Sequence, residues 1–333
     1  MSELAATSVV SSIEPIDRVL IEGPDHLWRR LFSSGRFLVG GAMLLMVLGS
    51  CIVSVFWTGR ESLGVDEEGY TIENPYYFDS QDPSSAEKPP SREKLTHWFG
   101  TDQLGRSILM RCLFGGTVSL EIGAAAATVA VLLGVTVGLV AGYRGGWIDA
   151  LLMRSVDIMY GLPYVLLIIL FKIALEEPLS KLFTNASIAN RAVLFMAIGL
   201  VSWLTMARVV RGQVLSLRSQ PFIEAGRAVG LPQWRIFLFH LLPNIIGPII
   251  VYATLTVPQA ILSESFLSFL GIGIQAPMPT WGSLAAEGLV PGLLPHQPSW
   301  WMLLFPCTLL ALTLLSLNFV GDGLRDLFDP KRE

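Results

Sequence analysis

Apolar runs alternate with polar connections along most of the chain. The runs occupy residues 37–57, 118–142, 151–175, 192–210, 245–266 and 300–320. A helix needs about 20 predominantly apolar residues to cross a hydrocarbon core about 30 Å thick. The pattern therefore predicts an all-α integral membrane protein with six transmembrane helices.

The polar connections divide the chain into five parts. Residues 1–36 are a polar N-terminal segment, and residues 37–57 are the first transmembrane helix. Residues 58–97 are rich in acidic residues and prolines, which predicts an irregular acidic insert outside the membrane. The other five transmembrane helices form a core over residues 98–320, and a short charged tail follows at 321–333.

The same pattern predicts a surface helix, a helix-packing stripe and two loops within the core. Residues 108–114 combine apolar side chains with an arginine, which predicts a short amphipathic helix at the membrane surface before the second transmembrane helix. Gly134, Gly138 and Gly142 recur every four residues within that second helix, a spacing that lets another helix approach closely. Two later polar connections are predicted to be loops, at residues 176–191 and 271–299.

Residues 222–244 are a helix-prone, polar island between two apolar runs. Pro221 suits the first turn of a helix, where its missing N–H costs nothing, and Gly230 suits a left-handed stop. Pro232 then reopens a helix, and Pro243 is expected to close it. The first helix has a small apolar side made of Ile223, Ala225, Ala228 and Val229. The pattern predicts a helix, a glycine elbow and a second helix.

Composition excludes several classes of protein. Only 15% of the residues are charged, against about 25% in soluble globular domains, and the mean hydropathy is +0.56. The net charge of −4 argues against a nucleic-acid-binding role. The three cysteines and four histidines are scattered, so neither a disulfide framework nor a metal site is predicted. We expect no cleavable signal peptide, because a long polar segment precedes the first apolar run.

The distribution of basic residues predicts the orientation in the membrane. The segment 208–244 contains several arginines, whereas 271–299 contains neither lysine nor arginine. The positive-inside rule places the arginine-rich segment in the cytoplasm. Six transmembrane helices then put both termini in the cytoplasm as well.

No signature of an enzyme that acts alone is present. The sequence lacks G-x-x-x-x-G-K-[ST], so the chain is not expected to bind ATP through a P-loop, and it lacks G-x-S-x-G and H-E-x-x-H. We therefore predict no catalytic residue, cofactor or metal in this chain.

Few charged residues lie in or near the predicted spans, and these are functional candidates because charge is costly in lipid. They are Glu121, Arg154, Asp157 and Glu264. Asp157, Glu264 and Pro163, which breaks the third span, are candidates for a translocation path. A structural role is the alternative for each. Arg154 and Asp157 can pair one turn apart, Pro163 can mark a packing kink, and Glu264 can fix a helix end.

Four separated segments carry motifs, at residues 99–107, 211–244, 265–273 and 318–331. Together they resemble one family, the inner-membrane permease subunits of ATP-binding cassette (ABC) importers, in its dipeptide/oligopeptide/nickel branch. The loop 211–244 is similar to the family motif E-A-A-x-x-x-G followed by nine residues and I-x-L-P. It reads Glu224-Ala225-Gly226, then Gly230, then His240-Leu241-Leu242-Pro243. Gly226 departs from the third-position alanine, and His240 takes the isoleucine position, as in that branch. The other similar segments are FGTDQLGRS (99–107), SFLSFLGIG (265–273) and NFVGDGLRDLFDPK (318–331).

The resemblance implies the six-helix fold of type I ABC importer permeases, with 211–244 as a cytoplasmic loop of coupling helices, the EAA loop. The residues that it implies for coupling to ATPase subunits are Glu224, Ala225, Gly226, Gly230, His240, Leu242 and Pro243. It also implies several partners, namely a second homologous permease, two cytoplasmic ATPase subunits that bind ATP and Mg²⁺, and an extracytoplasmic substrate-binding protein. The chain is then a non-catalytic subunit in the cell inner membrane, like the C-type member of an oligopeptide permease pair.

Peptides are the commonest substrates of this branch, but nickel chelates, opines and glycosides also occur, so the resemblance leaves the substrate open. The acidic insert and the loop 271–299 are expected to meet the binding protein. One alternative is an ion- or proton-coupled secondary transporter that uses Glu121, Asp157 or Glu264. Such transporters are typically built from internal repeats, and none is visible here. A membrane scaffold that transports nothing is a second alternative.

Overall fold

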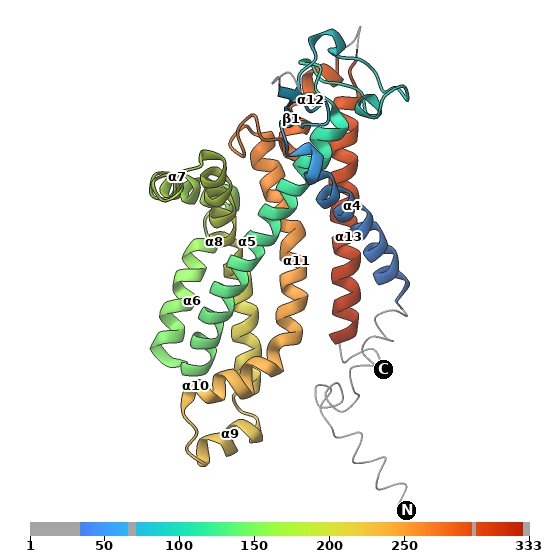
Figure 1. Ribbon diagram of the computed structural model, residues 1–333. Coiled ribbons are helices and arrows are strands. Elements are labelled where there is room, and N and C mark those ends of the chain that lie inside the picture. Colours follow the sequence, from blue (N-terminus) through green and yellow to red (C-terminus); the bar gives the residue numbers. More distant parts are fainter. Residues whose placement is uncertain (1–33, 66–70, 295–297, 329–333) are drawn as a thin grey trace, which may run out of the picture.

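Long helices form most of the molecule, which is shown in Figure 1. The computed structural model describes residues 34–65, 71–294 and 298–328, so the N-terminal segment up to residue 33 and the last five residues of the tail lie outside it. The helices are α4 (Gly35–Thr58), α5 (Ile108–Arg144), α6 (Gly146–Tyr160), α7 (Tyr164–Leu182), α8 (Ala186–Leu217), α9 (Pro221–Ala228), α10 (Gln233–Ile236), α11 (Leu242–Phe269), α12 (Trp281–Gly292) and α13 (Trp301–Phe328). Shorter elements are the strands β1 (Ser62–Val65) and β2 (Thr71–Glu73), two 3₁₀ turns at Pro83–Ser85 and Leu95–His97, and a π-helical segment, η3, at Phe237–Leu241.

The number of spans agrees with the predicted number. Among the described residues, five helices are long and apolar enough to cross a membrane, and α6 with α7 makes a sixth if the bent pair is one span. The axes of α6 and α7 differ by 103° at the break Gly161–Pro163. Pro163 is the N-cap of α7, in an extended conformation that ends one helix and starts another. The break that the sequence predicted is therefore a sharp corner between two helices.

The predicted surface helix at 108–114 does not exist as a separate element. Residues 108–144 form the single 37-residue helix α5, which starts where the Ser107 hydroxyl caps the amide of Met110. Gly115 and Gly116 do not interrupt it, because they lie against other parts of the chain. A Cβ atom on Gly116 would stand 2.5 Å from the ring of Trp281. The two glycines are a site of close packing, which sequence alone does not distinguish from a helix stop.

Two predicted loops contain helix, because polar side chains in them cap helix starts. The polar stretch 176–191 contains the end of α7 and the start of α8, with a connection of three residues between them. Asn185 starts α8 because its side chain accepts hydrogen bonds from the amides of Ser187 and Ile188. The stretch 271–299 contains α12, which opens with a capping box between Thr280 and Ser283. Likewise α13 continues to Phe328, past the predicted end of the last span.

The glycine stripe of α5 confirms the predicted close approach of a second helix, and that helix is α8. A Cβ atom on Gly134 would stand 2.5 Å from Cβ of Met206, and one on Gly138 would stand 2.7 Å from the Ala207 carbonyl oxygen. One on Gly142 would stand 2.8 Å from Cβ of Val214. Because the three positions lie on one face of α5, the two backbones lie in contact over about two turns.

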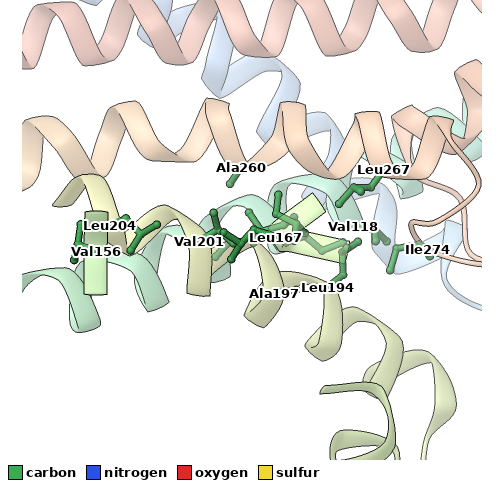
Figure 2. Packing of buried hydrophobic residues seen from close by; sticks show 14 residues of the cluster. Val118, Val156, Leu167, Leu194, Ala197, Val201, Leu204, Ala260, Leu267 and Ile274 are labelled. Carbon is green, nitrogen blue, oxygen red and sulfur yellow. The ribbon is translucent and has the colours of Figure 1, made fainter. Parts of the chain in front are cut away.

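The largest buried cluster lies where α5, α6, α7, α8 and α11 meet (Figure 2). Val156 of α6, Leu167 of α7 and Ala260 of α11 pack around residues of α8 such as Leu194 and Val201. On the other side of the molecule, α4 packs along α13, where a Cβ on Gly40 would meet Phe319 at 2.5 Å.

The acidic insert lies at the end of the molecule opposite α9 and α10 (Figure 1). Its strands pair antiparallel, with Ser62 opposite Glu73. The Asn74 amide donates to the carbonyls of Trp57 (2.6 Å) and Arg60 (2.7 Å), which fastens the insert to the end of α4. Phe78 stacks on Phe114 of α5 at a centroid distance of 4.3 Å. The described part of the insert is thus an ordered cap over the ends of α4 and α5, anchored through Asn74 and Phe78.

We expect the substitution Gly138→Ala to lower the stability of the chain, because its methyl group would overlap the backbone of α8. Overpacking of this kind costs about 1–3 kcal/mol, whereas glycine to alanine in an open helix position gains about 0.5–1 kcal/mol. The matched control is Gly212→Ala in α8, where an added Cβ meets nothing within 4 Å. Thermal unfolding of the purified chain in detergent measures both. Equal shifts in the two variants, or a gain in stability in Gly138→Ala, would contradict the packing role of the stripe.

Candidate functional site

The segment 221–244 folds into the predicted helix, glycine elbow and helix. Pro221 occupies the first turn of α9, and the left-handed stop is Gly230, with φ of +80°. The amide of Leu231 reaches back to the Gly226 carbonyl (3.1 Å), which closes the end of α9. Pro232 is the N-cap of α10. Figure 1 shows α9 and α10 projecting at one end of the bundle.

Pro243 does not close the second helix, contrary to the sequence expectation. It lies in the first turn of α11, and α10, η3 and α11 follow one another without a break as a single stretch from Gln233 to Phe269. A proline inside a helix clashes with the carbonyl four residues earlier and lacks an N–H. The π-helical segment removes this conflict, since the Leu242 amide bonds to Phe237 in a wider turn. The elbow is therefore joined to a membrane span by continuous helix.

The faces of α9 also differ from the predicted apolar side. Ile223 is fully buried and Gly226 is buried beside it, whereas Ala225, Ala228 and Val229 are exposed, Val229 to 81%. Ile223 packs in a buried cluster with residues of α8 and α11, and Gly226 lies next to Leu231. The exposed residues, together with Phe222, leave an apolar outer face next to the carboxylate of Glu224. This outer face has no partner among the described residues.

The elbow is held to the bundle by contacts that sequence reasoning missed. Ile223, Ile236 and Leu241 form one buried cluster with Val210 and Val214 of α8. At the end of α5, the ring of Tyr143 lies against Phe237 (4.5 Å between centroids) and under the guanidinium of Arg227 (5.0 Å). A lone tyrosine at the end of a span carries no sequence signal for such contacts.

The remaining members of the predicted coupling set lie at the start of the span. His240 is within η3, where its Nδ1 is buried without a hydrogen-bond partner among the described residues. Its main-chain carbonyl accepts a hydrogen bond of 2.6 Å from the side-chain carboxamide of Asn244. Leu242 is half-buried and Pro243 is exposed. The predicted set therefore forms one continuous piece, the outer part on α9 and the inner part in η3 and the first turn of α11.

A second candidate site is a cavity of about 430 Å³ beside the corner between α6 and α7. Its walls come from the α6–α7 corner, α8 and α11. Hydroxyl and amide side chains are frequent among them, and these are Tyr160, Tyr164, Ser202, Thr205, Tyr252, Thr256 and Gln259. The hydroxyls of Tyr160 and Thr205 lie 2.5 Å apart, and that of Tyr164 lies 3.2 Å from Ser263.

Asp157 does not line this cavity but lies next to it, and its partner is not the predicted Arg154. Its carboxylate accepts a hydrogen bond of 2.7 Å from Arg208 of α8, and the Arg208 guanidinium lies 3.9 Å from the centroid of the Tyr160 ring. Pro163 separates two cavity-lining residues, Leu162 and Tyr164. Two of the three predicted path residues are thus near the cavity. A partner on another helix cannot be read from spacing along one helix.

Glu264, the third path candidate, is fully buried in α11 and does not line the cavity. Its carboxyl group accepts from the hydroxyls of Ser268 (2.7 Å), Ser119 (3.0 Å) and Ser265 (3.3 Å). The Ser119 hydroxyl also accepts from the Trp281 amide. Glu264 therefore ties α11 to α5 and to the start of α12, which is the helix-end role that the sequence left open.

An ion-pair network at the opposite end joins the insert to the bundle. Arg111, only 2% exposed, donates to Asp102 (2.9 Å) and to both oxygens of Glu287 on α12. Arg106 bonds Asp102 (2.7 Å) and Asp79 (2.9 Å). Burial lowers the pKa of Arg106. The hydrogen bond to Asp79 and the charge of Asp102 together raise the pKa by more than burial lowers it, so the net shift is upward. The only sequence signal was the motif that contains Asp102 and Arg106.

Comparison with known proteins identifies relatives along nearly the whole chain. Residues 134–333 match the family described as binding-protein-dependent transport system inner membrane component. The dipeptide transport system permease protein DppC of Bacillus subtilis is 39% identical over 96% of this chain and 89% of its own length. The oligopeptide transport system permease protein OppC of Escherichia coli is 37% identical over 95% of this chain and 94% of its own length.

A solved structure with a similar fold is an inward-facing conformation of the MetNI methionine ABC transporter. The match covers 67% of this chain and 98% of the other chain with a TM-score of 0.51. At 18% identity, it supports a shared fold and nothing finer.

We expect Glu264→Ala to destabilise the chain strongly, because three hydroxyls would lose their buried acceptor. An unsatisfied buried polar group costs about 1–3 kcal/mol, so the loss should reach about 2–4 kcal/mol. Glu264→Gln keeps one oxygen acceptor and should lose less than half as much. Thermal unfolding followed by tryptophan fluorescence compares them, with the exposed Glu177→Ala as the control. Equal losses for the alanine and glutamine variants would argue against the anchoring role.

Proposed function

Because the chain belongs to the family of inner membrane components of binding-protein-dependent transport systems, we propose that it forms half of the translocation path of an ABC importer for peptides. The observation that carries the choice of substrate is the similarity to peptide permeases along almost the full length, acidic insert included. The fold is that of ABC importer permeases, and the chain is a multi-pass membrane subunit.

The energy source in this proposal lies on other chains. This sequence has no P-loop, so ATP and Mg²⁺ bind to two cytoplasmic ATPase subunits. A second homologous permease completes the path, and an extracytoplasmic binding protein delivers the substrate. The N-terminus, the elbow and the C-terminus face the cytoplasm, as the arginine-rich segment 208–244 indicates.

The outer face of α9 is the proposed contact with an ATPase subunit. A short helix with an exposed apolar face fits a groove on a protein surface, and Phe222, Ala225 and Val229 provide that face. Glu224 adds a charge for a basic residue of the groove. Because α10, η3 and α11 are continuous, movement of α9 is transmitted to the span as a rigid-body displacement.

The acidic insert is proposed to contact the binding protein. It lies at the end of the molecule away from α9 (Figure 1), and Glu73, Glu87 and Glu93 are exposed on it. The ion pair of Asp79 with Arg106, which also bonds Asp102, holds the insert over the bundle. A rigid, negatively charged cap suits docking of a protein with a basic rim.

The direct test is uptake of radiolabelled tri-alanine by proteoliposomes that hold the reconstituted complex, with ATP inside and the binding protein outside. Vanadate-sensitive, ATP-dependent uptake supports the proposal. Uptake driven by a proton gradient without ATP would support the secondary-transporter alternative instead. The carboxylates that the alternative needs are already engaged, Glu121 with Arg191 at 2.6 Å, Asp157 with Arg208, and Glu264 with serines.

We expect Glu224→Lys and Gly230→Pro each to abolish uptake while the chain remains in the membrane. The first reverses the charge on the proposed docking face. The second fixes φ near −65° where the elbow needs +80°. Co-purification of the ATPase subunits and peptide uptake are measured together. The matched charge reversal Glu177→Lys, on exposed α7, should change neither. Normal uptake with normal co-purification in both variants would rule out coupling through α9.

We expect the double substitution Glu73→Gln and Glu93→Gln to raise the binding protein concentration that gives half-maximal uptake, by several-fold at low salt. Both side chains are exposed, so their loss weakens steering and leaves the fold intact. The difference from wild type should shrink at high salt as the charges are screened. A half-maximal concentration that is unchanged at low salt would reject the insert as the docking surface.

A further inference from the structure

The cavity beside the α6–α7 corner exposes polar groups at a depth where lipid does not tolerate them. Asp157 lies eleven residues from the start of α6, which is about 16 Å along the helix axis, near the middle of a hydrocarbon core about 30 Å thick. Its side chain is 62% exposed and that of Arg208 is 42% exposed. Charged groups within a membrane face a protein interior or water, so this side of the chain faces an aqueous path.

The walls of the cavity offer hydrogen bonds and no net charge. Among the described residues, its lining contains hydroxyl, amide and apolar side chains but no ionised one. The Gln259 carboxamide is exposed and makes no hydrogen bond to another described residue. Each hydroxyl that is already paired keeps a further acceptor position. These are the groups that pair with main-chain amides of any sequence.

The ion pair at the edge of the cavity is loosely made. Arg208 contacts Asp157 through a single nitrogen–oxygen pair at 2.7 Å. By contrast, Arg211 holds Asp149 through two parallel contacts of 2.5 and 2.6 Å. A guanidinium carries five N–H donors that suit a carboxylate in a bidentate arrangement. Arg208 therefore retains the capacity to bind a second carboxylate.

We propose that Arg208 binds the C-terminal carboxylate of a peptide in transit, in exchange for Asp157. The hydroxyls and Gln259 bind the main chain of that peptide in the cavity. This inference rests on the proposed function and deepens it, because it names a recognition site within the membrane. The cavity volume of about 430 Å³ lies in the range of about 300–1,000 Å³ for sites that hold a small ligand.

Tyr160 and Asp157 have distinct positioning roles in this site. The Tyr160 ring supports the guanidinium from one side, at 3.9 Å, while its hydroxyl is held by Thr205. Asp157 neutralises Arg208 when the cavity holds no peptide and competes with the bound carboxylate, which speeds release. Because such a site binds the main chain and the C-terminus of the peptide, it accepts peptides with many different side chains. A path for mixed peptides requires this tolerance.

The test compares uptake of tri-alanine with uptake of its C-terminal amide, which lacks the carboxylate charge. The reconstituted complex is used with one binding protein throughout. The preference of the binding protein for the acid or the amide is then the same in every measurement. It cancels when the acid-to-amide ratio of uptake efficiency is compared between variants. Arg208→Gln should lower this ratio by about tenfold, the loss of one charge-assisted hydrogen bond. Asp157→Asn removes the competitor and should raise it or leave it unchanged.

The matched control is Arg191→Gln. It breaks an ion pair of the same kind, Arg191 with Glu121 at 2.6 Å, about 25 Å along α8 from Arg208. Its ratio should equal that of wild type. Opposite or unequal effects of the Arg208 and Asp157 variants separate recognition from general damage to the fold.

Three outcomes overturn the inference. They are a wild-type ratio in Arg208→Gln, a ratio that falls equally in Arg208→Gln and Arg191→Gln, and a lowered ratio in Asp157→Asn. If Arg208→Gln does not assemble, the uncharged Arg208→Met takes its place, and a wild-type ratio in that variant equally overturns the inference. Absence of ATP-dependent uptake in wild type instead removes the proposed function, and this inference falls with it.

Discussion

The contact between α5 and α8 is the constraint on which the rest of the bundle depends. Three glycines let the two backbones touch, and α5 then extends beyond α8 to contact α4, α6, α11, α12 and α13. A hydrophobic driving force between helices is absent in lipid, so close backbone packing carries much of the association. Because α5 is one helix of 37 residues, it also links the acidic cap at one end with the elbow at the other.

Polar side chains within the spans must be kept away from lipid. They are of two kinds, which differ in how this is achieved. Glu264 is fully enclosed by serines and joins three segments, so its role is structural. Asp157 and Arg208 are exposed beside a cavity, so their energetic cost is acceptable only where water or a polar ligand replaces lipid. Exposure, more than charge, distinguishes the anchor from the proposed binding site here.

One helix, α11, connects the elbow with the cavity. Helix α11 follows η3 directly, and its residues Tyr252, Thr256 and Gln259 form one wall of the cavity. Its far end is anchored through Glu264 to α5 and to the start of α12. Tilting of the elbow would therefore move a cavity wall about an anchored end. In such a lever, the proposed ATPase contact and the proposed peptide site need no other connection.

The sequence by itself determined the number of spans, the elbow at Gly230, the close-packing stripe on α5 and the family. These features depend on local chemistry: apolar length, backbone conformation at glycine and proline, and residue spacing. Tertiary structure decided where Gly115 and Gly116 pack, how a π turn admits Pro243, and which arginine pairs with Asp157. Each of these depends on a neighbour distant in the chain, and periodicity within one helix reports which face is apolar without reporting which partner meets it.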